Sequence, residues 1–226
     1  MTKALFITAT STDVGKTYIS SLITKSLIDN KVNAGYYKPV LSGANIENNK
    51  VISCDGLEVL KYSSLNEDLD KCVSYIMKTP VSPHLASKIE GIDINLDKIK
   101  SDFNNLKEKY DYITVEGAGG IICPVNLERN IMLTDVIKAL NLDIVIVTNP
   151  YVGAINSTVL TVEYAKSIGI NIKGIILNCF DYKNIAHIDN KNVIESITNI
   201  PIIDVVEKNK GLNIDTNTIC SLYREV

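Results

Sequence analysis

Short apolar runs recur along the chain, and segments with helical spacing lie between most of them. The runs fall at Leu5–Thr8, Ala34–Tyr37, Tyr112–Val115, Ile144–Thr148, Gly174–Leu177 and Ile202–Val206. The clearest helical segment runs from Leu96 to Lys109 and places its apolar residues on one stripe. This alternation predicts an α/β fold in which helices flank both faces of a mostly parallel sheet. Two polar segments, 45–50 and 181–192, are predicted to be mobile loops.

The size and composition of the chain fit one packed domain. It has 226 residues, of which 46% are hydrophobic and only 6% aromatic, with no tryptophan. A sheet rich in Ile, Val and Leu, covered by helices, has this composition, and single α/β domains often reach this length. We therefore expect residues 1–226 to form a single domain.

Charge and cysteine usage narrow the range of partners and compartments. The formal net charge is −3, and Arg129 and Arg224 are the only arginines. Such a chain offers no basic stripe for nucleic acid or an anionic membrane. No apolar run approaches the ~20 residues of a membrane helix, and the N-terminus does not resemble a signal peptide. The five cysteines form no CxxC pair, so we expect a protein of the reducing cytoplasm.

The residues that follow the first apolar run are typical of a phosphate-binding loop. Residues 9–17 read Ala-Thr-Ser-Thr-Asp-Val-Gly-Lys-Thr. In such a loop, backbone N–H groups and the next helix's N-terminus face a polyphosphate, Lys16 adds a cation, and Thr17 is placed to bind magnesium. Thr10 stands where the general pattern has its first glycine, so this loop is one residue longer and opens at Ala9. The alternative is a strand-to-helix turn with a chance Gly-Lys-Thr, which the flanking strand and helix disfavour.

Ligands of open parallel sheets bind outside the carboxyl ends of the strands, so the residues after the other apolar runs are informative. Lys38 comes directly after one such run and is followed by Pro39. A lysine before a proline is by itself more often a solvated loop residue. Beside a phosphate loop, however, Lys16 and Lys38 together would neutralise the charge that spreads over a transferred phosphoryl group.

A second motif, Glu116-Gly117-Ala118-Gly119-Gly120, follows another run. A carboxylate at a strand end can hold magnesium or its water shell, and the glycines let the backbone approach a phosphate or substrate closely. Asp55 lies at the expected start of a helix over 56–62, where it could be an N-cap or a magnesium ligand. Thr17, Asp55 and Glu116 would make an all-oxygen magnesium set.

Taken together, these motifs resemble the dethiobiotin synthetase family. The matching segments are 10–17, 37–40 with Ser42-Gly43, Asp55, Ser82-Pro83-His84, 116–120, 153–156 and Asn178, in order over most of the chain. The resemblance implies a three-layer P-loop NTPase-like fold and a homodimer with its active site at the interface. It also implies an ATP- and Mg²⁺-dependent cyclo-ligase that joins carbon dioxide to 7,8-diaminopelargonate and releases dethiobiotin, ADP and phosphate.

The resemblance also implies roles for individual residues. Catalysis would fall to Lys38, Lys16 and Thr12, and magnesium to Thr17, Asp55 and Glu116. The nucleotide would contact Asp13, Val14, Gly15, Lys16, Thr17, Tyr18, Asp55, Glu116, Gly117, Ala118, Gly119 and Asn178. The substrate would contact Thr12, Lys38, Ser42 and Gly119, together with Gly153 and Asn156, which would come from the partner subunit.

The sequence departs from the family pattern at Ala9, at Ser11 and over 204–207, where the family commonly has a glycine and a proline lining the base pocket. We therefore expect weaker discrimination between nucleotides. A related amidoligase or partitioning-type ATPase, and a nucleotide-dependent switch or binding module, remain alternatives. Partitioning proteins usually carry an extra lysine early in the loop, which residues 10–12 lack, and a switch has little use for Lys38 and Ser42 arranged as a second pocket.

Overall fold

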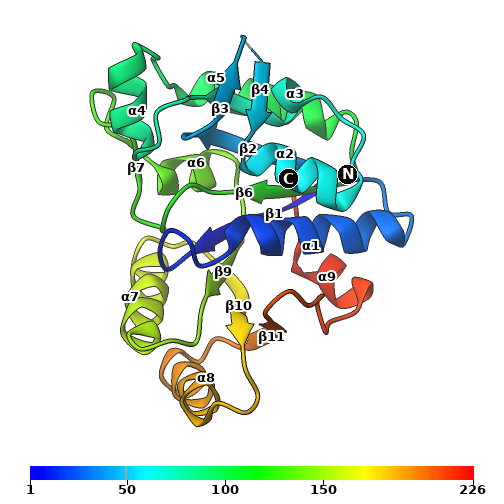
Figure 1. Ribbon diagram of the computed structural model, residues 1–226, viewed down its shortest axis with the longest axis vertical. Helices are drawn as coiled ribbons and strands as arrows, with labels where there is room; N and C mark the ends of the chain where they lie inside the picture. The colour runs from blue at the N-terminus through cyan, green and yellow to red at the C-terminus, as the bar shows by residue number, and fades with distance from the viewer. Residues whose placement is uncertain (49) are drawn as a thin grey trace.

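The fold is centred on a twisted sheet, as Figure 1 shows for the computed structural model, which describes residues 1–48 and 50–226. Within these residues, the strand order is β11-β10-β9-β1-β6-β2-β5, and β12 pairs with β1. The strands are β1 (Lys3–Ala9), β2 (Ala34–Leu41), β5 (Val73–Ile76), β6 (Tyr112–Glu116), β9 (Ile144–Thr148), β10 (Ile172–Phe180), β11 (Ile202–Glu207) and β12 (Arg224–Glu225). All pairs are parallel except β12 with β1. The predicted, mostly parallel sheet is confirmed.

Helices cover both faces of this sheet. On one face lie α1 (Lys16–Asp29) and α9 (Thr216–Leu222), with α2 (Asp55–Ser63) and α3 (Leu69–Cys72) beside them over β2. The other face is covered by α4 (Pro83–Glu90), α5 (Leu96–Lys107), α6 (Leu133–Ala139), α7 (Ala154–Ser167) and α8 (Ile185–Thr198). In β1, Leu5 and Ile7 pack under α1, whereas Phe6 packs in the core of the opposite face. The strands read as continuous apolar runs because both of their faces are buried.

The predicted elements are present, but β2 is longer than its apolar run. All six predicted strands are found, and the helix expected over 96–109 ends at Lys107. β2 continues past Tyr37 to Leu41, because it pairs with β6 up to Tyr37 and with β5 from Lys38 onward. Lys38 therefore lies inside a strand, not just beyond its end as predicted. β5 was not predicted.

Both segments predicted to be mobile loops contain regular structure. Residues 45–50 belong mostly to the hairpin of β3 (Asn45–Glu47) and β4 (Lys50–Ser53), and Asn49 lies outside the described residues. The second polar segment includes the first two turns of α8, where the Asn184 side chain accepts a hydrogen bond from the Ala186 amide (3.0 Å). Polar residues dominate there because most of the first half of α8 faces solvent. A second short hairpin joins β7 (Pro124–Asn126) and β8 (Ile131–Met132). None of the helices described is long and apolar enough to cross a membrane.

Candidate active site

The phosphate-binding loop joins β1 to α1 and is fixed to the neighbouring strand. The Thr10 amide donates to the Val147 carbonyl (3.1 Å), and the hydroxyls of Thr10 and Thr148 are 2.9 Å apart. Gly15 has φ of +100°, and a Cβ at that position would lie 2.0 Å from the Asn178 side-chain nitrogen. The left-handed backbone and this close neighbour both favour glycine here. Ala9 is the last residue of β1 and has extended backbone, so the loop does not need a glycine there.

A pocket of about 410 Å³ opens beside this loop. The residues that line it come from the loop, the start of α1, β2, α2 and the glycine-rich turn after β6: Thr12, Asp13, Gly15, Lys16, Thr17, Tyr18, Lys38, Val40, Ser42, Asp55, Glu58, Gly117, Ala118 and Gly119. Segments far apart in the sequence thus meet at one edge of the sheet. Val40 and Glu58 were not predicted. Glu58 follows Asp55 by three residues on α2, a spacing that puts both on one helix face.

The centre of the site is a buried ion pair. Lys38 Nζ lies 2.5 Å from Glu116 Oε1 and 2.9 Å from Asp55 Oδ2. The Lys38 side chain is 3% exposed and that of Glu116 is fully buried, whereas half of the Asp55 side chain is exposed. Thr17 Oγ1 donates a further hydrogen bond to Glu116 Oε1 (2.8 Å). Charges this deeply buried are tolerated only when paired and hydrogen-bonded, which is the case here.

The two lysines of the site differ in their proton affinity. Burial opposes the positive charge of Lys38, but Glu116 and Asp55 outweigh burial and raise its pKa above the ordinary value. Burial lowers the pKa of Lys16, and the neighbouring Lys38 ammonium lowers it further. Lys16 Nζ donates to the Ser11 carbonyl (3.2 Å), so its side chain folds back over the loop.

Tyr36 is a further member of the site that was not predicted. Its hydroxyl donates to Glu116 Oε2 (2.9 Å), and its side chain is fully buried. Burial and the adjacent carboxylate hold the pKa of Tyr36 well above the usual value, so the phenol keeps its proton. The signal in the sequence is its spacing: Tyr36 precedes Lys38 by two residues in a strand, so both point to the same face.

The residues proposed for magnesium converge in the structure. Asp55 is the first residue of α2 and Cys54 is its N-cap, so the N-cap interpretation of Asp55 is wrong; its carboxylate binds Lys38 instead. Within residues 1–48 and 50–226 no cluster of three His, Cys, Asp or Glu side chains has metal-binding geometry. The candidate set comprises two carboxylates and the Thr17 hydroxyl. Such a set fits Mg²⁺, which usually takes one or two carboxylates and keeps waters or phosphate oxygens as its other ligands.

Asn178 on β10 contacts the loop from the other side. Its amide nitrogen donates to the Val14 carbonyl (3.0 Å), while its Oδ1 is buried and lacks a partner among the described residues. Asp204 on β11 is occupied within the chain, because it accepts hydrogen bonds from the backbone and side chain of Asn213 (2.9 and 3.1 Å). An unpaired buried acceptor is a place where a ligand donor can bind.

Three of the predicted substrate residues behave differently from the rest. Ser42 lines the pocket, but its hydroxyl donates to the Val81 carbonyl (2.7 Å). Gly153 and Asn156 are not among the described residues that line the pocket. Gly153 is the N-cap of α7, and Asn156 is exposed in its first turn. One chain thus brings together the phosphate loop, Lys38 and the glycine-rich turn, but not the start of α7.

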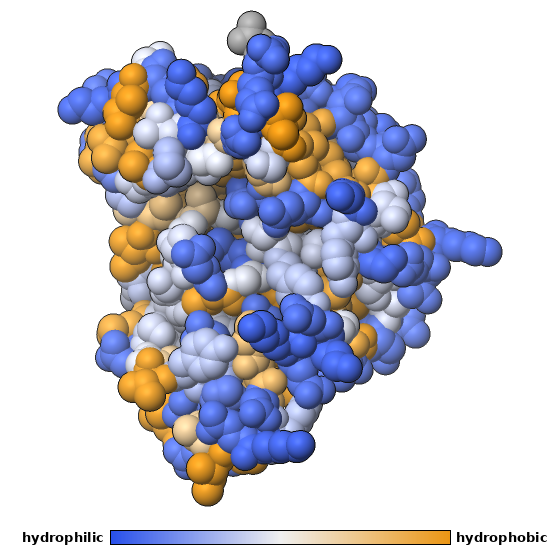
Figure 2. Space-filling model, viewed as in Figure 1, coloured by the Kyte–Doolittle hydropathy of each residue, from blue (hydrophilic) through white to orange (hydrophobic). Residues whose placement is uncertain are grey.

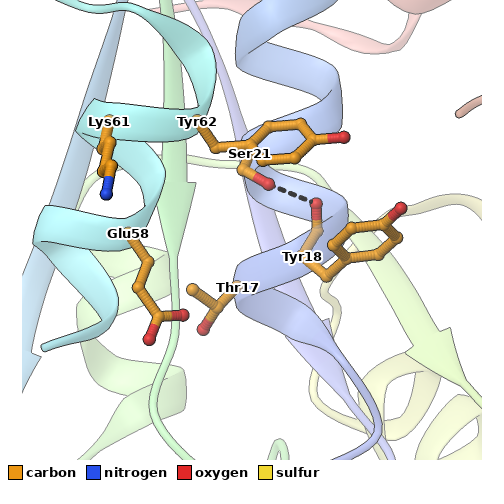
Figure 3. Close-up of a pocket in the computed structure, with 6 residues that line it drawn as sticks. All are labelled: Thr17, Tyr18, Ser21, Glu58, Lys61 and Tyr62. Atoms are coloured by element: carbon orange, nitrogen blue, oxygen red, sulfur yellow. Dashed lines mark hydrogen bonds between the residues drawn. The ribbon is translucent and has the colours of Figure 1, made fainter. Parts of the chain in front are cut away.

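A second cavity, also of about 410 Å³, lies between α1 and α2 and is drawn in Figure 3. Its lining residues are Thr17, Tyr18, Ser21, Glu58, Lys61 and Tyr62. The rings of Tyr18 and Tyr62 meet edge to face with centroids 6.0 Å apart. The cavity shares Thr17, Tyr18 and Glu58 with the phosphate pocket, so the two adjoin.

Comparison with known proteins gives consistent results. A family model described as an AAA domain matches residues 3–215. The chain is 46% identical over 224 residues to an ATP-dependent dethiobiotin synthetase BioD of Clostridium botulinum (strain Alaska E43), covering 99% of each chain. It is 49% identical over 209 residues to the protein of the same name from Clostridium perfringens (strain 13), covering 92% of each. Among solved structures, a ParA family ATPase from Chlorobium tepidum superposes with a TM-score of 0.58 at 18% identity, over 92% of this chain and 84% of that one. The last match confirms the predicted fold class.

Proposed function

Because this chain belongs to the family of ATP-dependent dethiobiotin synthetases, we propose that it closes the cyclic urea of dethiobiotin on 7,8-diaminopelargonate, using carbon dioxide, ATP and magnesium. The observation that carries the proposal is the pair of buried lysines beside the phosphate loop. Lys16 belongs to the loop, whereas Lys38 comes from β2, the strand that leads directly into Ser42, and all three line the pocket. This arrangement provides one cation for the nucleotide and one for a second, small substrate.

In the proposed reaction, each step uses groups that the pocket holds in place. A substrate amine captures carbon dioxide as a carbamate, and a carbamate oxygen attacks the γ-phosphorus of ATP with release of ADP. The second amine then attacks the carbonyl carbon of the mixed anhydride and expels phosphate. Lys38 and Lys16 would neutralise the negative charge of the carbamate and the transferred phosphoryl group, and the Thr12 hydroxyl would stabilise them by donating a hydrogen bond. Because both intermediates are labile, keeping them near the second amine and away from water is most of the task.

The metal would be held by Thr17, Asp55 and Glu116, whose oxygens converge on one edge of the pocket. Bound magnesium would neutralise charge on the phosphates and orient them. Both carboxylates also contact Lys38, so the metal and this lysine would share them. The two negative charges of Asp55 and Glu116 would offset only part of the three positive charges of Mg²⁺ and Lys38, which leaves net positive charge to face the phosphates.

The nucleotide would lie with its phosphates over the loop backbone from Asp13 to Thr17. The unpaired Oδ1 of Asn178 would accept a hydrogen bond from the base. Asp204 would not take part, because it already binds Asn213. Glu116 and the turn 117–119 would complete the site on the side of β6.

We further propose a homodimer in which the start of α7 from one subunit completes the pocket of the other. Gly153 and Asn156 lie at the N-terminus of a helix, a position suited to a substrate carboxylate. Hydrophobic side chains gather at the edge formed by α7 and α8, as Figure 2 shows at the lower left. Val152, Leu160 and Ile185 are more than half exposed there, and an apolar surface of this kind often marks an interface.

The reducing cytoplasm would suit the five free cysteines.

The direct test is to incubate the purified protein with 7,8-diaminopelargonate, bicarbonate and MgATP and to detect dethiobiotin by mass spectrometry. Dethiobiotin and ADP should form in equal amounts. Reactions without diaminopelargonate or without bicarbonate serve as controls. ATP hydrolysis at an undiminished rate in those controls, without any dethiobiotin in the full reaction, would favour the nucleotide-dependent switch instead.

A further inference from the structure

Tyr36 makes an unusual contact for a core tyrosine, because its hydroxyl binds a proposed metal ligand. The Tyr36 hydroxyl donates to Glu116 Oε2 (2.9 Å), whereas Thr17 and Lys38 both donate to Oε1 (2.8 and 2.5 Å). The two carboxylate oxygens are therefore distinguished: Oε1 faces Thr17 and Lys38, which line the pocket, and Oε2 faces the buried Tyr36. Among the hydrogen bonds of the described residues, that from Tyr36 is the one made to Oε2.

Burial makes this contact hard to replace. Tyr36 and Glu116 are both fully buried, so water cannot easily substitute for the phenol. A buried acceptor that loses its donor bears the cost of its desolvation, and the cost is larger for a charged group. Without the hydroxyl, Oε2 would have no hydrogen bond, and the Glu116 carboxylate could recover one by turning Oε2 toward the other donors, Thr17 and Lys38. Tyr36 thus opposes rotation of the carboxylate.

We propose that Tyr36 is a positioning residue that fixes the Glu116 carboxylate so that Oε1 alone is presented to magnesium. The inference rests on the proposed function, because it takes Glu116 as a metal ligand. Hydrogen-bonding partners of metal ligands orient them, and their loss typically weakens metal binding by about 10- to 100-fold. Tyr36 acts through Glu116 and does not itself touch the substrate or the metal.

The test compares Tyr36→Phe with Tyr37→Phe. Tyr37 is the adjacent residue, is equally buried, and also loses a buried phenol hydrogen bond on substitution, but its hydroxyl contacts the Ile99 carbonyl and Ser74 rather than Glu116. Magnesium affinity is measured by calorimetric titration of the ADP-bound protein, and thermal unfolding is followed without metal. We expect Tyr36→Phe to weaken magnesium binding by about 10-fold or more, and Tyr37→Phe to leave it within about twofold. Both variants should lose thermal stability, and Tyr36→Phe should lose more, because it removes the donor of a buried charged acceptor.

A second measurement keeps the Tyr36 hydroxyl in place, so it does not rely on the Tyr36→Phe protein. With 3-fluorotyrosine placed at position 36, the ¹⁹F resonance should shift when magnesium is added to the ADP-bound protein, and a probe at position 37 should shift much less. Unchanged magnesium affinity in Tyr36→Phe, an equal loss of magnesium affinity in both variants, or equal ¹⁹F shifts would overturn the inference while the proposed function stands. The magnesium affinity of Glu116→Gln tests the metal assignment itself. If that affinity is unchanged while the wild-type protein still needs magnesium to make dethiobiotin, Glu116 is not a metal ligand. The inference about Tyr36 then fails, but the proposed function stands.

Discussion

The phosphate pocket and the start of α7 lie beyond the carboxyl ends of strands in the same sheet, yet one chain completes them to different degrees. At the pocket, the lining residues Lys16 and Lys38 and the adjacent Glu116 are buried and hydrogen-bonded to neighbours within the chain. At the start of α7, Asn156 is exposed and Val152 is fully exposed. Buried charges must be neutralised where they lie, so the pocket is organised before any ligand arrives. An exposed helix start needs another surface to become a defined binding site.

The largest expected effect comes from removing the Lys38 side chain from the phosphate pocket, which is the region that one chain already organises. Lys38→Ala should lower the turnover of dethiobiotin formation by at least about 100-fold, since losing one preorganised charge contact commonly costs about 3 kcal/mol in the transition state. It should also lower the melting temperature, because Glu116 would stay buried without its cation. Steady-state rates are measured at a temperature where circular dichroism shows the variant to be folded.

Lys25→Ala is the matched control for this prediction. Lys25 lies on α1 and forms an exposed ion pair with Asp29, remote from the pocket residues. Its loss should leave turnover unchanged, since exposed pairs contribute little. Wild-type turnover in a folded Lys38→Ala protein would remove Lys38 from the catalytic residues.

The proposal that the start of α7 completes the pocket of the partner subunit is tested by mixing two variants. Lys16→Ala and Asn156→Ala proteins should each be impaired. If sites are shared, a heterodimer contains one site with both residues intact, and statistical exchange should restore activity to roughly a quarter of wild type. Sites built within single chains give no recovery. Exchange is confirmed independently with differently tagged subunits and native mass spectrometry.

A smaller effect is expected at the base-binding end of the pocket. Asn178→Ala should raise the KM for ATP by about 10-fold and that for GTP by less, because the buried oxygen proposed to accept from the adenine amino group is lost. In the wild type, preference for ATP over GTP and CTP should stay below about 1000-fold in kcat/KM, since Asp204 is bound to Asn213. Asn33→Ala is the control, because Asn33 lies directly before β2 and its side chain donates to the Lys109 carbonyl rather than to a pocket residue. A preference above that limit would contradict the expected relaxed selectivity.

The smallest effect concerns Glu67, which does not line the phosphate pocket and forms an ion pair with Lys109. Burial alone would raise the pKa of Glu67, but hydrogen bonds from Lys109 and Tyr110 outweigh burial and lower it to about 2. Because the folded-state pKa lies below the ordinary value of 4.5, this stabilisation is present above about pH 4.5 and is lost as the pH falls toward 2. Glu67→Gln should lower the melting temperature at pH 7 by about 2–4 °C, corresponding to about 1 kcal/mol.

The pH dependence distinguishes this effect from a simple packing change. The difference in melting temperature between Glu67→Gln and wild type should shrink steadily below pH 4.5. Glu163→Gln, which breaks an exposed pair with Lys166, is the control and should change little at any pH. A difference that is constant with pH would mean that Glu67 does not stabilise the fold through its charge.

The sequence predicted most of the sheet because its central strands are buried on both faces and read as uninterrupted apolar runs. It failed at the boundary of β2, where Lys38 and Pro39 look like a turn but pair with β5. The polar hairpin around residues 45–53 and the first turns of α8 were missed for a related reason. Their side chains are largely exposed, so hydrophobic periodicity is weak there.

The site was predicted to the extent that its residues belong to local motifs. The phosphate loop and the turn after Glu116 carry their chemistry in consecutive residues, and the structure brings both to one pocket. Contacts between motifs could not be read from spacing. The role of Asp55 as a partner of Lys38, rather than an N-cap, depends on where α2 packs against β2, and Tyr36 was hidden because an aromatic residue in an apolar run predicts core packing.

The antiparallel pairing of β12 with β1 has a consequence for protein synthesis. Arg224 and Glu225 pair with Ala4 and Lys3, and the Val226 amide donates to the Thr2 carbonyl (3.1 Å), so the two ends of the fold lie together, as the N and C marks in Figure 1 indicate. On the ribosome, residues 224–226 emerge after all the other residues described. Until then, the strand that leads into the phosphate loop keeps one edge open at Lys3 and Ala4. A nascent chain can therefore assemble the sheet around β1 during translation, but it can close this edge only after those last residues have left the exit tunnel.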